Sequence, residues 1–379
     1  MAFFSKFFDQ NEPVVLGVDI GSSAIKIVQL RKKNGQAVLD TYGELALGPY
    51  ANLGVGQAVI LPPEKIAEAL IDLMKEKEVN ITTKKCGISI PFSASLMSVI
   101  EMPEVSSKQL AVMVPLEARK YIPVPISEVM LDWSVIPRSE VESGSRDDSD
   151  PNPESGSGSS KAPPTMAKID VLVVAIHNET IARFQEIVMK SGLDAGFFEI
   201  EIFSTMRAVL DEALRPVMII DMGAASTKLY VVERGIIRSS HTINRGSQDI
   251  TSTISKSLSI TMERAEVMKR QVGAVGEDKS LTEAITLVLD YIFSEVNNAL
   301  LDFEKKHNKT ISKVIMVGGG SALKGLSELA KNNFKTDVVS ANPFNKVSAP
   351  AFLENILKET GPEFAVAIGL ALRKLAEED

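Results

Sequence analysis

Short apolar segments alternate along the chain with longer segments whose apolar residues recur every three or four positions. The short segments are typical of strands and the longer ones of amphipathic helices. Their alternation predicts an α/β protein. In the first half, the predicted strands are Val14–Asp19, Ile25–Leu30, Gly87–Ile90, Leu96–Ile100, Val129–Pro137, Ile169–Ile176 and Phe197–Ile202. The predicted helices are Pro63–Glu76, a segment from a capping box at Ser106 and Gln109 toward Tyr121, and Asn178–Ser191.

The second half of the chain follows the same alternation. Its predicted strands are Val217–Asp221, Thr227–Val232 and Lys313–Val317, and its predicted helices are Asp249–Leu258, Thr261–Val272 and Leu281–His307. A length of 379 residues fits two domains or one large body with two lobes.

One segment, Ser139–Thr165, differs in composition from the rest of the chain. It consists largely of Ser, Gly, Pro and Asp, which leaves little to bury and predicts a disordered loop. The loop separates two predicted strands, Val129–Pro137 and Ile169–Ile176, which favours an insertion within a subdomain. A linker between two domains is the alternative.

Composition and charge exclude several classes of function. A hydrophobic fraction of 45% is that of a chain with a core, and a net charge of −8 argues against nucleic-acid binding. Cys86 is the single cysteine, which excludes an intramolecular disulfide and a thiolate metal site. The three histidines have no ligand-like spacing, so no zinc site is expected.

The sequence contains no obvious membrane span or signal peptide, so we expect a cytoplasmic protein without a transmembrane segment. The N-terminal segment carries four phenylalanines, at positions 3, 4, 7 and 8. Such a cluster either touches a membrane or, as we favour, packs locally or binds a partner.

One nine-residue pattern occurs once in each half, at Val18–Lys26 and at Ile220–Lys228. Each copy has an apolar residue, an aspartate, an apolar residue, a glycine and small residues, with a lysine seven positions after the aspartate. We call Asp19–Lys26 the first hairpin and Asp221–Lys228 the second hairpin. Their recurrence predicts two similar lobes that face each other.

The chemistry of these hairpins suits a polyphosphate. Glycine allows a sharp turn, and successive N–H groups then form an anion-binding concavity. An aspartate at the end of the strand is placed to hold the waters of Mg²⁺. The predicted metal-binding residues are Asp19 and Asp221. The predicted phosphate-binding residues are Gly21, Ser22, Ser23 and Lys26 in one hairpin, and Gly223, Ala224, Ala225, Ser226 and Lys228 in the other. Ordinary turns with solvent-facing lysines are the alternative.

A third motif and one helix complete the candidate site. The predicted strand ending at Val317 runs into Gly318, Gly319 and Gly320, which leave room for a flat adenine or ribose; a flexible turn is the alternative. Leu323 follows the glycines and is included among the nucleotide-binding candidates. Glu266 and Lys269 lie three positions apart on one helix face, suited either to ribose hydroxyls or to an ordinary ion pair.

Together these motifs resemble the actin, heat-shock chaperone and sugar kinase superfamily of ATPases. The two hairpins are similar to its phosphate motifs, Gly318–Gly320 to its adenosine motif, and Glu363–Ala371 to its closing helix. Within the superfamily, Val15–Lys26 most resembles the PilM family of type IV pilus assembly proteins. The match departs at Arg245-Gly246-Ser247, where that family often has two glycines, so an added side chain either alters a nucleotide contact or points outward.

The resemblance implies an actin-like ATPase fold with two lobes around a nucleotide cleft and an extra subdomain inserted in lobe one. The implied parts are an N-terminal segment 1–12, lobe one from 13–90 and 196–214, an inserted subdomain 91–195 containing the loop 139–165, and lobe two from 215–379. It also implies ATP and Mg²⁺ as cofactors.

By the same resemblance we expect a cytoplasmic scaffold of a type IV pilus or a related system, held at the inner-membrane platform through its partners. A groove between the first subdomain and the insertion would bind the N-terminal cytoplasmic peptide of PilN. ATP turnover would be slow at most, with Glu201 as the candidate that positions water.

Two other functions remain open at this stage. A metabolite kinase of the same fold would need a carboxylate base near its acceptor, and no carboxylate motif stands out for that role. A division protein like FtsA would end in a basic amphipathic helix, whereas Lys374–Asp379 is acidic.

Overall fold

The computed structural model describes residues 12–136, 167–211 and 214–378. They form two compact units: a core unit, residues 12–92 and 183–378, and a small unit, residues 93–182. The predicted N-terminal segment and the predicted loop 139–165 lie outside the described residues, apart from Glu12. The predicted boundaries of lobes and insertion stay predictions.

The core unit contains a first sheet of five strands in the order β3-β2-β1-β4-β8. Strands β1 to β3 form an antiparallel meander, and β4 and β8 continue the sheet in parallel with β1. The strands are β1 Val14–Ile20, β2 Ala24–Lys33, β3 Gln36–Ala46, β4 Lys85–Ile90 and β8 Asp194–Ile200.

A second sheet of the core unit repeats this arrangement in the order β11-β10-β9-β12-β13. Its first three strands are again antiparallel, and β12 and β13 again run parallel to β9. The strands are β9 Val217–Met222, β10 Thr227–Glu233, β11 Ile236–Ile243, β12 Lys313–Val317 and β13 Asp337–Ser340. The internal repeat predicted from two short motifs therefore extends to whole sheets.

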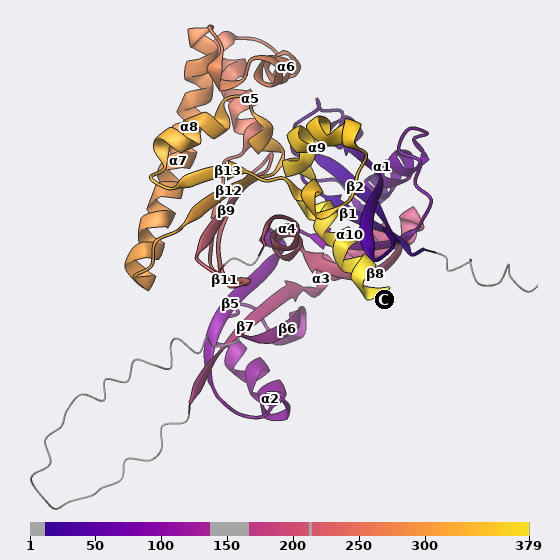
Figure 1. Cartoon of the computed structure of the whole chain (residues 1–379), viewed down its shortest axis with the longest axis vertical. Coiled ribbons are helices and arrows are strands. Elements are labelled where there is room, and N and C mark those ends of the chain that lie inside the picture. Colours follow the sequence, from indigo (N-terminus) through magenta and orange to yellow (C-terminus); the bar gives the residue numbers. More distant parts are fainter. Residues whose placement is uncertain (1–11, 137–166, 212–213, 379) are drawn as a thin grey trace, which may run out of the picture. The chain divides into compact units, whose positions relative to one another are not determined.

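Close packing holds the helix α10, Ala365–Glu377, against the first sheet (Figure 1). A side chain at Gly17 of β1 would overlap the Ala367 carbonyl oxygen, and one at Gly369 would overlap the Ser204 carbonyl oxygen of α4, Glu201–Val209. The helix therefore belongs to the core of the first sheet, although the sequence-based division counts it with lobe two. The other helices beside this sheet are α1 Pro63–Lys75 and α3 Asn178–Ser191, of which α3 begins in the small unit.

The longest helix, α7, Lys279–His307, packs its apolar stripe into the core of the second sheet. It is long and apolar enough to cross a membrane by length and composition, but 44% of that apolar window is buried. Packing against this sheet accounts for its buried stripe, while Leu287 and Leu301 on the opposite side are exposed. The other helices of this region are α5 Ser247–Leu258, α6 Met262–Val272 and α8 Leu326–Asn333, whereas α9, Glu354–Thr360, lies beside α10 and the first sheet (Figure 1).

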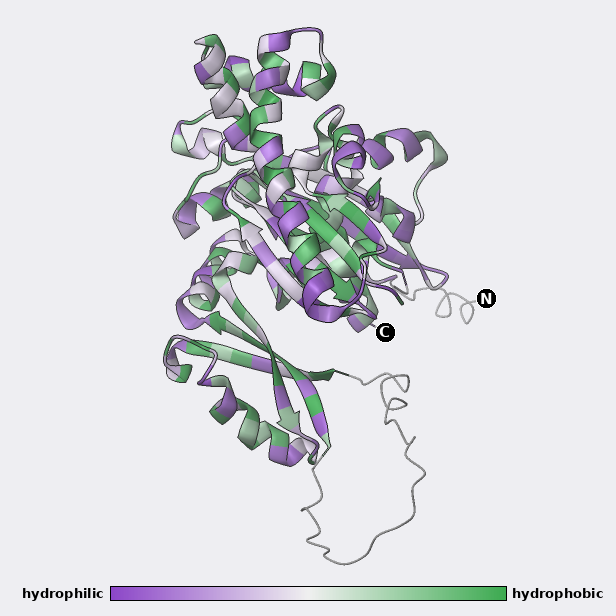
Figure 2. Cartoon of the chain, turned by 90° about the vertical axis from the view of Figure 1, so that its left-hand side faces the viewer, coloured by the Kyte–Doolittle hydropathy of each residue, from purple (hydrophilic) through white to green (hydrophobic). Residues whose placement is uncertain are grey.

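The small unit has a three-stranded sheet in the order β5-β7-β6, covered on one face by α2, Ser107–Ala118. The predicted capping box at Ser106 and Gln109 is confirmed. The strands are β5 Ser95–Pro103, β6 Val129–Ile136 and β7 Lys168–His177. Polar and apolar residues are interspersed along the outer strands β5 and β6 (Figure 2), which fits a sheet covered on one face.

Most predicted elements are confirmed to within a few residues, but one boundary is wrong. The predicted strand Phe197–Ile202 ends at Ile200, and helix α4 begins at Glu201. Ile202 and Met206 continue the apolar run as the buried face of that helix, so hydrophobicity alone does not mark the change.

Candidate nucleotide site

The first hairpin closes tightly around its two serines. The Gly21 N–H donates to the Ala24 carbonyl at 3.0 Å, and the carbonyls of Ser22 and Ser23 accept from Val59 and Leu47 at 2.8 Å. Within the described residues, the N–H groups of Ser22 and Ser23 have no backbone acceptor. The turn thus holds its carbonyls fixed and leaves two adjacent donors for an anion.

The second hairpin has the same geometry. The Gly223 N–H donates to the Ser226 carbonyl at 3.0 Å, and the carbonyls of Gly223 and Ala224 accept from the first N–H groups of α5 at 2.9 and 3.0 Å. In the part of the chain that the structure covers, Ala224 and Ala225 likewise have no backbone acceptor for their N–H groups. Both corners therefore fit phosphate oxygens by the chemistry of their donors.

A glycine lets helix α5 approach the second hairpin. A side chain at Gly246 would overlap the carbonyl oxygens of Ala224 and Gly223, so this position requires glycine. The neighbouring Arg245 points outward instead: its side chain is 55% exposed and lies over the Tyr291 ring at 5.9 Å. The departure at Arg245 therefore adds no side chain to the hairpin.

The seven-residue spacing of Asp and Lys has a direct structural meaning. Asp19 pairs with Lys26 across the antiparallel strands, and Asp221 pairs with Lys228 in the same way. Each lysine thus lies beside the aspartate of its own hairpin on one face of the sheet. Both side chains are largely buried, at 12% and 17% exposure, so the alternative of solvent-facing lysines is wrong.

Lys228 joins carboxylates from both sheets. Its Nζ lies 2.7 Å from Glu201 Oε1 at the start of α4 and 3.4 Å from Asp221 Oδ2 at the end of β9. Asp19, at the end of β1, also interacts with this ammonium and raises its pKa, as do Glu201 and Asp221, in spite of burial. Asp19 and Asp221 therefore share one electrostatic cluster, which we call the acidic cluster: Asp19, Glu201, Asp221 and Lys228.

Asp19 is a carboxylate of the acidic cluster with a raised pKa. Burial raises its pKa to about 6; Lys26 opposes the shift and the negative charge of Glu201 adds to it. Its Oδ1 accepts a hydrogen bond from the Ser89 hydroxyl at 2.8 Å, and that hydroxyl accepts from the Ile20 N–H at 3.1 Å. The hydrogen bond thus fixes the side chain in place, while burial disfavours its ionised form. Both features are expected of a carboxylate that binds a cation.

Glu201, the predicted water-positioning residue, is held by two donors. Its Oε1 accepts from the Phe92 N–H at 2.6 Å and lies 2.7 Å from the Lys228 ammonium. The structure therefore places it in the acidic cluster, where its role toward water stays a prediction.

Magnesium fits this cluster only in part. In the described ranges no group of three or more His, Cys, Asp or Glu side chains is close enough to hold a metal ion. Mg²⁺ keeps most of its waters and needs one or two carboxylates, which Asp19 and Asp221 provide. These two residues would hold it, and the ion would neutralise phosphate charge.

The three glycines serve two purposes. A side chain at Gly318, where φ is +85°, or at Gly320 would overlap or crowd Asp221 and Met222 of β9. Gly319 has open space up to Glu363, whose nearest oxygen would lie 3.5 Å from an added Cβ. Leu323 packs onto the core of the second sheet. Gly318 and Gly320 thus allow the end of β12 to pack closely against β9, whereas Gly319 borders open space.

The predicted ribose pair is a buried ion pair rather than a surface one. Lys269 Nζ lies 2.6 Å from Glu266 Oε2, which also accepts from the Thr251 hydroxyl at 2.6 Å. Burial alone would raise the pKa of Glu266, but Lys269 and its other donors outweigh it and lower the pKa. A ribose hydroxyl at this position would have to share an acceptor already in use.

A loop beside the first sheet reaches this pair. Gly56 has a φ of +85°, and an added Cβ would lie 2.7 Å from the Glu266 carboxyl carbon. The Ala58 N–H donates to the Gln248 side-chain oxygen of α5 at 3.1 Å. We call residues 53–58 the bridging loop, because they connect the first sheet's region to the helices of the second.

Sequence reasoning missed three residues of the site. The Ser89 hydroxyl donates to Asp19, and Glu44 Oε1 lies 3.4 Å from Lys26 Nζ. The third residue, Glu363, faces Gly319. Burial raises the pKa of Glu363 although Lys26 opposes it. Ser89 comes from β4 and belongs to no motif, and Glu44 lies opposite Lys26 on the neighbouring strand β3. Glu363 opens the segment that resembles the closing helix, but the resemblance did not mark it as a site residue.

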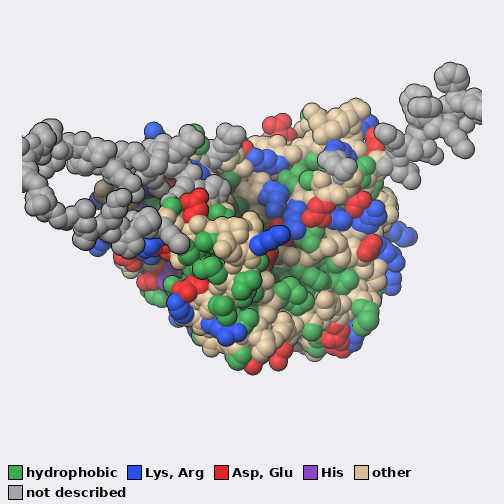
Figure 3. All heavy atoms as spheres, turned by 90° about the horizontal axis from the view of Figure 1, so that it is seen from below, with side chains coloured by type: hydrophobic (Ala, Val, Ile, Leu, Met, Phe, Trp, Pro, Cys, Tyr) green, Lys and Arg blue, Asp and Glu red, His purple; other side chains and the backbone are tan. Residues whose placement is uncertain are grey.

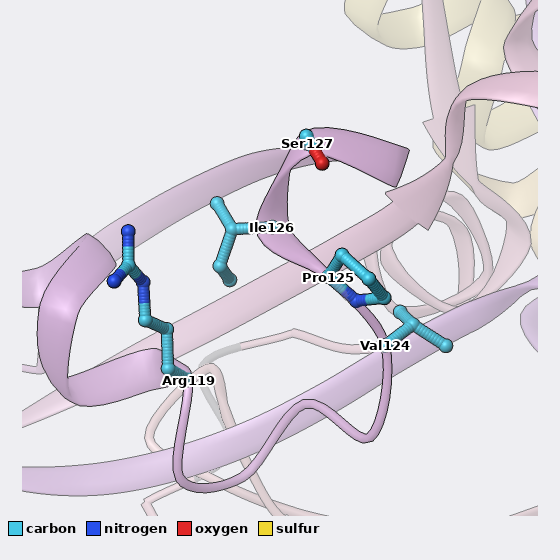
Figure 4. Close-up of a pocket in the computed structure, with 5 residues that line it drawn as sticks. All are labelled: Arg119, Val124, Pro125, Ile126 and Ser127. Atoms are coloured by element: carbon cyan, nitrogen blue, oxygen red, sulfur yellow. The ribbon is translucent and has the colours of Figure 1, made fainter.

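Outside the core unit, the small unit carries a pocket of about 450 Å³ lined by Arg119, Val124, Pro125, Ile126 and Ser127 (Figure 4). Arg119, just after α2, stands opposite Ile126. The same helix exposes Val112 and Leu116, at 66% and 55%. Hydrophobic side chains also gather beside charged ones on the molecular surface seen from below (Figure 3).

Two sheets of identical strand order, each with a glycine-cornered hairpin at the end of its first strand, define the fold of the actin-like ATPases. The fold predicted from the sequence is thus confirmed. The ethanolamine utilization protein EutJ of Carboxydothermus hydrogenoformans shares it, with a TM-score of 0.52 at 14% identity over 95% of this chain and 89% of that one.

The family model of the type IV pilus assembly protein PilM matches residues 17–148 and 158–375, and the chain belongs to this family. A chain of the solved PilM-PilN type IV pilus biogenesis complex is 25% identical, with a TM-score of 0.76, covering 95% of this chain and 98% of that one. The cell division protein FtsA of Bacillus subtilis (strain 168) is 20% identical over 391 residues, 95% of this chain and 83% of that protein.

Proposed function

We propose that this protein is an ATP-binding scaffold of type IV pilus assembly. The observation that supports ATP most strongly is the pair of equivalent hairpins, each with two free N–H groups, whose aspartates share the Lys228 ammonium. The phosphates would lie between the hairpins, and Asp19 and Asp221 would hold Mg²⁺. The remaining nucleotide contacts predicted from the sequence belong to the same proposal.

The protein's own groups favour binding over rapid hydrolysis. A strong general base needs a carboxylate free to accept a proton from water. Glu201 is instead held by Lys228 and by the Phe92 N–H. Slow turnover is thus part of the proposal, as is a coupling in which nucleotide state changes the affinity for a partner.

The proposed partner is the N-terminal cytoplasmic peptide of a PilN protein, through which the chain would join the inner-membrane platform. Family membership and the likeness to a chain of the PilM-PilN complex support this proposal. The exposed Val112 and Leu116 show that the small unit has apolar surface that a peptide could cover.

Titration of a labelled PilN N-terminal peptide into the protein, with and without Mg²⁺ and a non-hydrolysable ATP analogue, tests both parts. We expect saturable binding of peptide and nucleotide, with a peptide affinity that differs between the two conditions. A protein that binds the nucleotide but no candidate peptide would remove the pilus partner and leave the ATP site. A protein that binds neither would refute the proposal.

The likeness to FtsA keeps a second candidate, a polymer-forming division protein. Sedimentation of the protein with Mg-ATP distinguishes the two. A scaffold should stay in the supernatant, whereas a polymer would pellet in a nucleotide-dependent way.

A further inference from the structure

The acidic cluster contains one cation shared among three carboxylates. Lys228 Nζ contacts Glu201 and Asp221 directly, and Asp19 interacts with the same ammonium. These carboxylates come from three separate elements, α4, β9 and β1. The other nearby lysine, Lys26, lies across the strands from Asp19 and interacts with it, and it also lies 3.4 Å from Glu44 and interacts with Glu363.

Carboxylates gathered around one ammonium repel one another when little water screens their charges. The contacting side chains are only 11 to 17% exposed, so the repulsion is poorly screened. A cation must therefore lie among them for the carboxylates to stay charged together. In the protein alone, Lys228 supplies that cation for Glu201 and Asp221, which it contacts directly, while Lys26 also acts on Asp19.

We propose that Lys228 is a built-in cation of the nucleotide cleft, which Mg²⁺ must displace from Asp221 and Glu201 before it can bind there. This inference rests on the proposed ATP-binding function and adds the way in which the metal is admitted. The displaced ammonium belongs to the second hairpin, whose Ala224 and Ala225 N–H groups have no backbone acceptor among the described residues. It would find a new anion in the phosphates that arrive with the metal. Metal and nucleotide would thus bind together, and the metal alone would bind poorly.

A buried hydroxyl next to the cluster supports a second arrangement of Lys228. Tyr230 lies two residues further along β10, on the same face of the sheet as Lys228. It is 2% exposed, and its hydroxyl interacts with the side chain of Thr205, although within the described residues it makes no hydrogen bond of good geometry. Both Asp221 and Glu201 act on it electrostatically. A hydroxyl in this position can turn from Thr205 and donate to a neighbouring carboxylate that loses the ammonium.

The test measures Mn²⁺ binding to the nucleotide-free protein by the electron paramagnetic resonance signal of free Mn²⁺. Wild type should bind the ion weakly. Lys228→Met leaves Asp221 and Glu201 without the cation that contacts them and should bind Mn²⁺ at least tenfold more tightly. Lys228→Arg keeps the charge and should stay weak. The matched control is Lys309→Met, which removes another lysine that contacts a buried glutamate, Glu233, at 2.8 Å; it should leave Mn²⁺ binding unchanged.

The outcomes separate this inference from the proposed function. If wild type binds the ATP analogue but Lys228→Met binds Mn²⁺ no better than wild type, the role of Lys228 is refuted and the nucleotide site stands. If wild type binds no nucleotide under any condition, the proposed function fails first. Should Lys228→Met not fold, Lys228→Gln replaces it. A comparison within the wild-type protein is a second test. If it binds Mn²⁺ as tightly without nucleotide as with it, the inference is overturned.

Discussion

Replacing Asp19 by asparagine should stabilise the nucleotide-free protein at neutral pH. Burial raises the pKa of Asp19 from 3.8 to about 6, against the opposing effect of Lys26 and with a contribution from Glu201. A raised pKa means that the folded protein binds this proton more tightly than the unfolded chain does. Stability is therefore gained in acid, near and below the unfolded pKa, and lost as the pH rises through 6.

The size of the effect follows from the two pKa values. One pKa unit corresponds to ~1.4 kcal/mol, so a shift of roughly two units amounts to ~3 kcal/mol at pH 8. Asparagine does not ionise, and its side-chain oxygen can still accept the Ser89 hydroxyl bond. Asp19→Asn should thus be more stable than wild type by ~3 kcal/mol at pH 8 and by less than about 1 kcal/mol near pH 4.

Urea unfolding followed by circular dichroism between pH 4 and pH 8, without nucleotide, measures this difference. Asp302→Asn, on the exposed face of α7, is the control and should show no such dependence on pH. A variant that is less stable than wild type at pH 8, or equally stabilised at both pH values, would refute the reasoning. The same variant should bind Mg-ATP at least tenfold more weakly, because the stabilised site has lost a carboxylate for the metal.

Three further substitutions test other contacts. Gly246→Ala, whose methyl group would overlap the second hairpin, should weaken binding of a fluorescent ATP analogue at least tenfold; its neighbour Arg245→Ala should not, and equal affinities would disprove the close approach. Gly56→Ala places a methyl group against Glu266 at a residue whose φ is +85°, so it should lower the free energy of unfolding by about 1–2 kcal/mol. The Ala58 amide hydrogen should exchange faster in this variant, and an unchanged exchange rate would argue against the contact of the bridging loop. Arg207→Met removes two hydrogen bonds, at 2.7 and 2.8 Å, to the buried Glu199, to which Arg373 also donates at 2.8 Å. The variant should lower the free energy of unfolding by about 3–5 kcal/mol, and a loss below about 1 kcal/mol would show that the bond from Arg373 is sufficient.

The repeat and its spacing were readable in the sequence because they are local. In a hairpin with a turn of fixed length, two residues seven positions apart become neighbours across the two strands. The spacing of Asp19 and Lys26, and of Asp221 and Lys228, therefore determines their pairing. Which face of the strand is covered is not local information. The burial of Lys26 and Lys228 depends on Glu44 and Glu201, which other elements supply.

The rest of the site depends on long-range packing. Ser89 reaches Asp19 from β4, and Glu363 reaches Gly319 from the segment before α10, 44 residues along the chain. The bridging loop meets Glu266 about two hundred residues away in sequence. No periodicity or motif announces such pairs, because they arise only when both sheets are formed.

A crystal structure with Mg²⁺ and a non-hydrolysable ATP analogue tests the central claim most directly. The account predicts phosphate oxygens at about 3 Å from N–H groups of both hairpins, at Ser22 and Ser23 and at Ala224 and Ala225. It also predicts Mg²⁺ between Asp19 and Asp221, with Lys228 moved away from Glu201. A nucleotide that touches one hairpin only, or that binds elsewhere on the core unit, would contradict it.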